Sequence, residues 1–315
     1  MAHVHCVIIG FAKFDRKIKL LDGIEVNQIN GYLLDAPNVF IQNRVGMLTP
    51  DFPEMTKGSQ ITDGGNLIIE AGDLDAFLKK DPRAKKFIRR YMMGREFLYN
   101  LPRYCLWLVD AEPNEIKSIK PIYERVEACK NFRLTSKTAS VRRDSKTPWL
   151  FTQDRQPSSG NILVIPTVSS ERREYIPIGY LDSETVVGII QMIPNATLEL
   201  FGILTSSVHM AWARVVCGRL ETRLSYTPSV YHNFPFPKPN PKIEVTAQKI
   251  LDARSNHPNS SLAELYDPNL MPIDLRKAHE ENDRAVLDSY GFPRNISESE
   301  IVSRLFEMYQ ELIRK

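Results

Sequence analysis

The chain has 315 residues, of which 43% are hydrophobic and 25% are charged, a composition typical of a globular protein with room for two domains. It holds no apolar run of 18 residues and no signal peptide, which argues against a membrane-spanning or secreted class, and we expect a cytoplasmic protein. The formal net charge of +3 is too small to indicate a partner. The four cysteines lie far apart in apolar segments, which predicts reduced core residues.

The first part of the chain predicts strands. Apolar runs at residues 4–11 and 18–21 are typical of β-structure, and turn-rich sequence follows them. His3 and His5, two residues apart at the start of this segment, would share one face of a strand. Two histidines without a third ligand do not predict a metal site.

The middle of the chain is strongly basic. Residues 81–146 contain 16 lysines and arginines against 8 aspartates and glutamates, a local balance of +8. This charge indicates a polyanionic partner, although the alternative is that many of these lysines only solvate helices. Residues 135–148 are polar, basic and without periodicity, which predicts a flexible loop that orders on DNA.

Several arginines and lysines in and beyond this loop are candidates for phosphate contacts. Such contacts supply affinity and register but carry no sequence information. The candidates are Arg142, Arg143, Lys146 and Arg155, followed by Arg172 and Arg173. Because Ser169 and Ser170 predict a tight polar turn, the alternative is that some of these side chains brace the fold.

Residues 198–226 predict one helix followed by one strand. Thr197 is suited to cap the helix, apolar residues then recur at helical spacing, and Gly218 suits its end. Beyond Gly218 the period changes to two. The predicted inner face consists of Leu220, Thr222, Leu224 and Tyr226. The predicted outer face consists of Arg219, Glu221, Arg223 and Ser225.

This outer face carries hydrogen-bonding groups suited to base edges. A glutamate accepts from cytosine N4, and an arginine donates to guanine O6 and N7. Glu221 and Arg223, two residues apart, therefore fit a C·G pair better than an A·T pair. The alternative is that these charges are merely solvated on a half-exposed strand.

The last part of the chain predicts helices after a linker. Residues 234–242 contain four prolines in nine positions and can continue neither a helix nor a strand ladder. Ser297 and Glu300 form a capping box for the final helix. We therefore expect an α/β (α+β) fold, with a mixed, largely antiparallel sheet and flanking helices, followed by a small all-α domain.

Several sequence blocks resemble the target-recognition domain of MmeI-like proteins. These are large chains that fuse a DNA adenine-N6 methyltransferase, often with a nuclease, to a recognition domain and a helical C-terminal domain. The blocks read HVHCVIIGF, TDGGNLIIE, RYCLWLVD, QPSSGNILVIPTVSSERREYIPIGYL, IPNAT and YHNFPFP. Together they cover most of residues 3–237 in order, and the remaining residues fit the family layout through weaker motifs.

The resemblance implies three segments. Residues 1–25 would be the last strands of a methyltransferase sheet, residues 26–237 the DNA target-recognition domain, and residues 238–315 the helical domain. The chain contains neither a glycine-rich turn for S-adenosylmethionine nor the Asn/Asp-Pro-Pro-Tyr/Phe tetrapeptide that grips a flipped adenine. We therefore expect no catalytic residue and no cofactor in this chain, which alone should not catalyse. The parent protein would bind S-adenosylmethionine through its missing N-terminal methyltransferase domain.

In the family interpretation, the outer face of the 219–226 strand reads double-stranded DNA for restriction-modification. Two other functions stay open. One is a stand-alone nucleic-acid-binding protein without a catalytic parent, and the other is an enzyme whose site carries no recognisable motif. A pocket lined by titratable residues would favour the enzyme.

Overall fold

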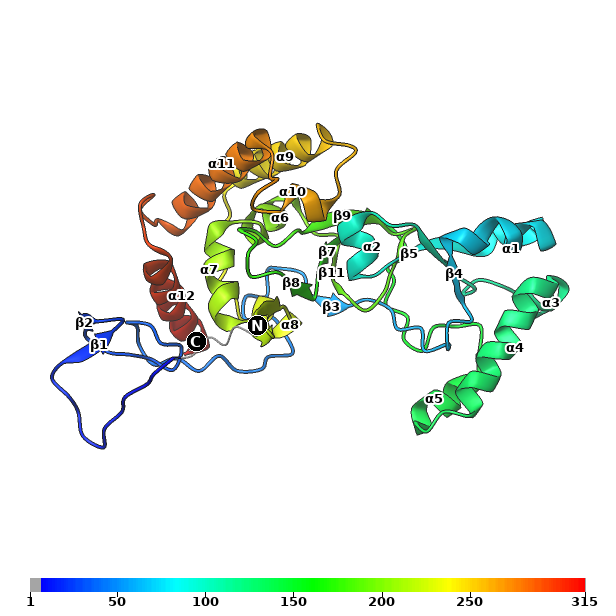
Figure 1. Cartoon of the computed structure of the whole chain (residues 1–315), viewed down its shortest axis with the longest axis horizontal. Helices are drawn as coiled ribbons and strands as arrows, with labels where there is room; N and C mark the ends of the chain where they lie inside the picture. The colour runs from blue at the N-terminus through cyan, green and yellow to red at the C-terminus, as the bar shows by residue number, and fades with distance from the viewer. Residues whose placement is uncertain (1–6, 315) are drawn as a thin grey trace, which may run out of the picture.

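Two four-stranded sheets form the centre of the molecule, which a computed structural model describes for residues 7–314 (Figure 1). In the first sheet, ordered β10-β5-β6-β4, the β10–β5 pair is parallel and the other pairs are antiparallel. Its strands are β4 (Ile68–Glu70), β5 (Ile88–Met92), β6 (Arg103–Leu106) and β10 (Val186–Val187). The second sheet is antiparallel and runs in the order β3 (Thr56–Lys57), β11 (Gln191–Pro194), β7 (Asn161–Ile165) and β9 (Gly179–Asp182). The expected mixed, largely antiparallel α+β fold is confirmed.

Helices extend from the first sheet to form one end of the molecule (Figure 1). We call α1, α3, α4 and α5 the helical arm. The elements of this region are η1 (Ala71–Asp73), α1 (Leu74–Lys80), η2 (Pro82–Phe87), α2 (Gly94–Tyr99), α3 (Pro113–Ser118), α4 (Lys120–Leu134), α5 (Ala139–Arg143) and η3 (Asp144–Lys146). The arm has its own core, which includes Leu67, Phe77, Leu106, Ile122 and Val126.

The second sheet packs against a pair of buried helices, α6 (Leu198–Leu204) and α7 (Ser207–Val216). A short helix, α8 (Pro228–His232), comes later in the chain. The single helix predicted for this region is interrupted at Thr205 and Ser206. Ser206 caps α7 by accepting a hydrogen bond from the backbone N–H of His209 at 3.2 Å. Serine and threonine side chains compete for backbone hydrogen bonds, which explains a break at this pair.

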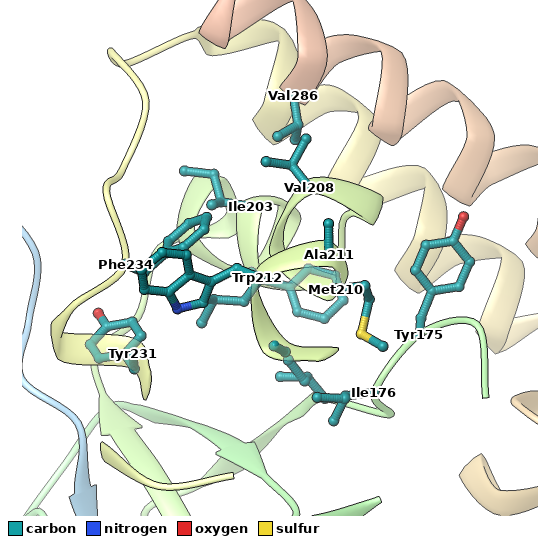
Figure 2. Close-up of a cluster of buried hydrophobic side chains, with 14 of the residues drawn as sticks. Tyr175, Ile176, Ile203, Val208, Met210, Ala211, Trp212, Tyr231, Phe234 and Val286 are labelled. Atoms are coloured by element: carbon teal, nitrogen blue, oxygen red, sulfur yellow. The ribbon is translucent and has the colours of Figure 1, made fainter. Parts of the chain in front are cut away.

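The C-terminal helices share one core with α6 and α7. They are α9 (Pro241–Ser255), α10 (Leu262–Leu265), α11 (Ile273–Tyr290) and α12 (Glu298–Ile313). Figure 2 shows Val286 of α11 beside Val208 of α7, and Trp212 of α7 beside Phe234. A Cβ atom on Gly202 would lie only 2.5 Å from Cγ2 of Ile243, so α6 and α9 are in close contact. Within residues 7–314, the helices lack the combination of length and hydropathy that a bilayer crossing needs.

The proline-rich segment predicted as a linker is packed into this core in its first half. The ring centroid of Phe234 lies 5.9 Å from that of Trp212 and 5.0 Å from that of His209. Phe234 is fully buried and Phe236 is 6% exposed. The aromatic residues between the prolines thus anchor the connection to α9, so the segment is not a free linker.

The strand predicted over residues 4–11 is wrong for residues 7–11, which form no regular element. Ile8 and Phe11 are 98% and 95% exposed, and within residues 7–314 no strand pairs with this segment to supply backbone partners. Strands β1 (Lys19–Leu21) and β2 (Ile24–Val26) pair with each other as a separate hairpin. His3 and His5 lie outside the described residues.

Arg133 of α4 holds the base of the helical arm. Its fully buried guanidinium donates to five backbone carbonyl oxygens at distances of 2.8–3.1 Å. The acceptors belong to Ile61, Thr62, Asp144, Thr147 and Leu150. The flexible loop predicted over residues 135–148 is therefore wrong: α5 and η3 form there, because the arginine satisfies carbonyl groups that a loop would leave to water.

Asp283 of α11 joins the C-terminal helices to the rest of the chain. Its carboxylate accepts hydrogen bonds from the backbone N–H of Ser207 at 2.7 Å and from the hydroxyl of Tyr175 at 2.8 Å. Burial nevertheless raises the pKa of Asp283 to about 6, against the opposing effect of these hydrogen bonds.

We expect Arg133→Lys to lower the free energy of unfolding by about 3 kcal/mol or more, because a lysine cannot satisfy this set of carbonyl groups. Hydrogen exchange should accelerate at residues 144–150. Arg143→Lys, on the exposed surface of the same arm, is the matched control and should change stability by less than about 0.5 kcal/mol. Equal stability of the two variants would contradict this role of Arg133.

The raised pKa of Asp283 makes stability depend on pH in a defined direction. The folded state binds this proton more tightly than the unfolded state, so the contribution is present below about pH 4 and is lost as the pH rises through 6. Relative to Asp283→Asn, the wild-type free energy of unfolding should fall by about 2–3 kcal/mol between pH 4 and 7. Urea unfolding across this range tests the expectation, and a constant difference between the two proteins contradicts it.

Candidate nucleic-acid interface

The single strand predicted over residues 219–226 is a two-stranded hairpin. Strands β12 (Gly218–Leu220) and β13 (Arg223–Ser225) are antiparallel, and Glu221 and Thr222 form the turn between them. The prediction of one strand is wrong because polar and apolar residues keep alternating through the turn at Glu221 and Thr222, so the pattern does not mark the change of direction. Glu-Thr also lacks the glycine or asparagine that usually marks such a turn.

The hairpin separates Arg219 from the other predicted base-reading residues. Opposite residues of an antiparallel pair share a face, and Arg219 pairs with Leu224, which is buried against the core. Arg223 and Ser225 belong to the other face. The prediction of one four-residue face is therefore wrong, because the chain reverses direction between Arg219 and Arg223.

The other face presents exposed Arg223 and partly buried Ser225, with exposed Glu221 beside them in the turn. The Oε2 atom of Glu221 lies 2.8 Å from Nη2 of Arg223, and their side chains are 77% and 44% exposed. This pair offers an acceptor and a donor side by side in solvent. Leu220 lies opposite Arg223 and is 50% exposed, although the sequence pattern placed it on the inner face. Only the hairpin register reveals its position.

A third strand brings another basic segment beside the hairpin. Strand β8 (Val168–Ser169) pairs with β13 and is followed within four residues by Arg172 and Arg173. The backbone N–H of Arg172 donates to the hydroxyl of Ser170 at 3.3 Å, in agreement with the predicted polar turn. Arg172 is exposed, whereas Arg173 is partly buried and burial lowers its pKa.

The remaining phosphate candidates lie away from this three-stranded sheet. Arg142, Arg143 and Lys146 lie together on α5 and η3, which Figure 1 places on the arm, apart from β8. Arg143 and Lys146 are exposed, while Arg142 donates to the carbonyl oxygens of Ser136 and Lys137 at 2.8 and 2.9 Å.

Arg155 is hydrogen-bonded to the segment that follows β3 of the second sheet. Its backbone N–H donates to the hydroxyl of Ser59 at 3.0 Å, and its Nη1 donates to the carbonyl oxygen of Gly58 at 3.2 Å. The side chain is nevertheless exposed. The structure therefore divides the basic candidates among three places: the arm, the Arg155 segment and the loop after β8.

The buried histidine beside the hairpin and the buried cysteines of the chain are core residues. Nε2 of His209 lies 2.8 Å from the hydroxyl of Tyr226, and burial lowers the pKa of His209 to about 4, so the ring is neutral in the core. The thiols of Cys105, Cys129 and Cys217 are buried, as predicted, and are unpaired with one another, whereas the fourth cysteine, Cys6, lies outside the described residues. Within residues 7–314, no group of three or more histidines, cysteines and acidic residues is placed to hold a metal ion.

Comparisons with known proteins agree with this architecture. Residues 35–238 match the family model described as MmeI, target recognition domain, and residues 236–315 match that described as MmeI, C-terminal domain. The chain is 34% identical over 322 residues to DNA methyltransferase A of Bacillus subtilis (strain 168), an alignment that covers 99% of this chain and 36% of the relative.

A solved structure has the same fold. It is described as type IIL restriction-modification enzyme MmeI in complex with DNA, and it superposes with a TM-score of 0.88 at 38% identity over 93% of this chain and 40% of that one. The chain thus spans well under half the length of both relatives. On these matches, it belongs to the MmeI family and corresponds to the family's target recognition and C-terminal domains.

Proposed function

We propose that this chain recognises a specific sequence in double-stranded DNA as part of a restriction-modification DNA methyltransferase. The observation that carries the proposal is the exposed Glu221–Arg223 pair at a hairpin turn, in a chain of the MmeI family. Its two relatives support the same class, since one is named a DNA methyltransferase and the other was solved in complex with DNA.

The hairpin has a suitable shape for direct reading of bases. The major groove admits a two-stranded β-ribbon, and each base pair presents a distinct pattern of donors and acceptors there. Glu221 would accept from cytosine N4 while Arg223 donates to guanine on the same base pair. One C·G pair is therefore the preferred target of the turn. Ser225 would contribute a hydroxyl farther along the same face of the hairpin.

Basic residues on either side would hold the DNA backbone. Exposed Arg143 and Lys146 on the arm and Arg172 beside the hairpin are free to approach phosphates. The structural hydrogen bonds of Arg142 and Arg155 give these two a bracing role as well. Contacts at separated places would fix the register of the duplex against the hairpin.

We further propose that the parent protein transfers a methyl group from S-adenosylmethionine to adenine N6. The greater length of the relatives leaves room for a catalytic domain, and the methyltransferase name of one of them fits this chemistry. In this scheme the present chain holds the duplex while an N-terminal methyltransferase domain, its partner in the same polypeptide, takes the adenine out of the stack.

Exchanging the charges of the turn tests the base-reading proposal. Glu221→Lys combined with Arg223→Asp should change the preferred base pair at one position, with discrimination of about 1–3 kcal/mol, because donor and acceptor trade places. The measurement is selection from random duplex DNA at low and at higher salt, with thermal unfolding to show that the variant folds. An unchanged motif would reject the assignment, and wild-type binding without any motif would reject specific recognition by this chain.

The phosphate assignment predicts a change in salt dependence. Replacing Arg143 and Lys146 together with Ala should reduce the slope of log K against log salt by about two, following roughly one counterion per contact. The control is Lys242→Ala with Lys277→Ala, two exposed lysines on the C-terminal helices, where the slope should stay constant. An unchanged slope in the arm variant removes the arm from the interface.

A further inference from the structure

The turn that carries Glu221 has an unfavourable backbone conformation. Glu221 has φ of +58°, in the left-handed region that a side chain with Cβ adopts at a cost of about 1 kcal/mol. The turn is also exposed, so burial does not hold it. A fixed position for the Glu221 carboxylate therefore needs another constraint on the turn.

Arg219 supplies such a constraint. Its Nη1 donates to the carbonyl oxygen of Thr222 in the turn at 3.3 Å, and its Nη2 donates to the carbonyl oxygen of Arg214 at 2.7 Å. Arg214 lies in the last turn of α7, where unpaired carbonyl groups favour a cation. One planar guanidinium thus joins the turn to the end of a buried helix.

Arg214 is in turn fixed by two other parts of the chain. Its Nη1 donates to Oε2 of Glu298 at the start of α12 at 2.6 Å, and its Nη2 donates to the carbonyl oxygen of Glu174 at 3.2 Å. The carboxylate of Glu174 also pairs with Arg276 of α11 at 2.7 Å. Arg219 and Arg214 therefore connect the hairpin turn with α12, and Glu174 extends the connection to Arg276 of α11.

We propose that Arg219 is a positioning residue, which holds the Glu221–Arg223 turn ready for base contact and takes its anchor from Arg214 and Glu298. The inference rests on the proposed function of the hairpin and changes the role predicted for Arg219. Its side chain is exposed, but its guanidinium donates to two backbone carbonyls, and its strand position shares a face with Leu224 and not with Arg223. Specificity at the base pair contacted by the turn therefore depends on residues that do not touch DNA.

The main test is Arg219→Lys, which keeps the charge but removes the planar fork. Discrimination at the base pair read by Glu221 and Arg223 should fall about tenfold, while other positions of the motif and the salt slope stay unchanged. A direct base contact by Arg219 would instead relax a different position of the motif. If Arg219 bound a phosphate, Arg219→Ala would lower the slope by about one and leave the motif intact. Either of these results would overturn the positioning role.

A remote variant separates positioning from contact. Glu298→Gln removes the anchoring charge of Arg214 and should weaken discrimination at the same base pair, by about threefold. The matched control is Glu280→Gln, because Glu280 pairs with Arg284 and not with Arg214. Equal behaviour of these two variants would contradict the connection through α12.

A measurement without DNA tests the positioning role of Arg219 separately from the proposed function. Amide hydrogen exchange at residues 221–223 of the free protein should accelerate in Arg219→Lys, while exchange in α7 stays unchanged. Unaltered exchange at the turn would overturn the positioning role. If exchange changes as expected but the wild-type chain selects no DNA motif, the proposed function fails and the positioning role stands.

Discussion

The burial of α7 is the constraint on which the position of the Glu221–Arg223 hairpin depends. Trp212 is fully buried between Phe234 and α12, and its indole N–H donates to the carbonyl oxygen of Val230 at 2.9 Å. Only Cys217 separates the end of α7 from β12. The hairpin therefore cannot move far without α7, and α7 cannot move without opening a cavity that costs several kcal/mol. The hairpin thus starts at the end of a buried helix, and Arg219 ties its exposed turn to that same helix.

The C-terminal helices complete that same core and also reach the hairpin through charges. Phe306 and Tyr309 of α12 pack against Trp212, while Glu298 at the other end of α12 binds Arg214. The segment that matches the target recognition domain and the segment that matches the C-terminal domain therefore share one hydrophobic core around α6 and α7. This arrangement gives the C-terminal helices a bracing role for the recognition segment, whatever further contacts they make.

The sequence predicted the fold class, the helical C-terminal part and the core positions of Cys105, Cys129 and Cys217, because periodicity and apolar neighbours indicate burial. It could not predict the hairpin, since a Glu-Thr turn with positive φ at Glu221 has no local signature and preserves the alternation. The role of Arg133 has no signature in the sequence, because its carbonyl acceptors lie up to 72 residues away in the chain. For the candidate site, the sequence showed which residue types are present. It could not show that Glu221 lies beside Arg223 or that Arg219 lies on the opposite face, because both facts depend on the register of the hairpin. Their roles on DNA stay predictions.

Hydrogen exchange of the chain with and without duplex DNA at low salt is the most direct test of the hairpin as the DNA-reading element. We expect slower exchange with DNA at residues 219–224, together with the basic segment at residues 139–147, and little change in α9 and α11. Protection confined to the C-terminal helices, with the hairpin exchanging at its free rate, would contradict a DNA-reading role for the Glu221–Arg223 turn.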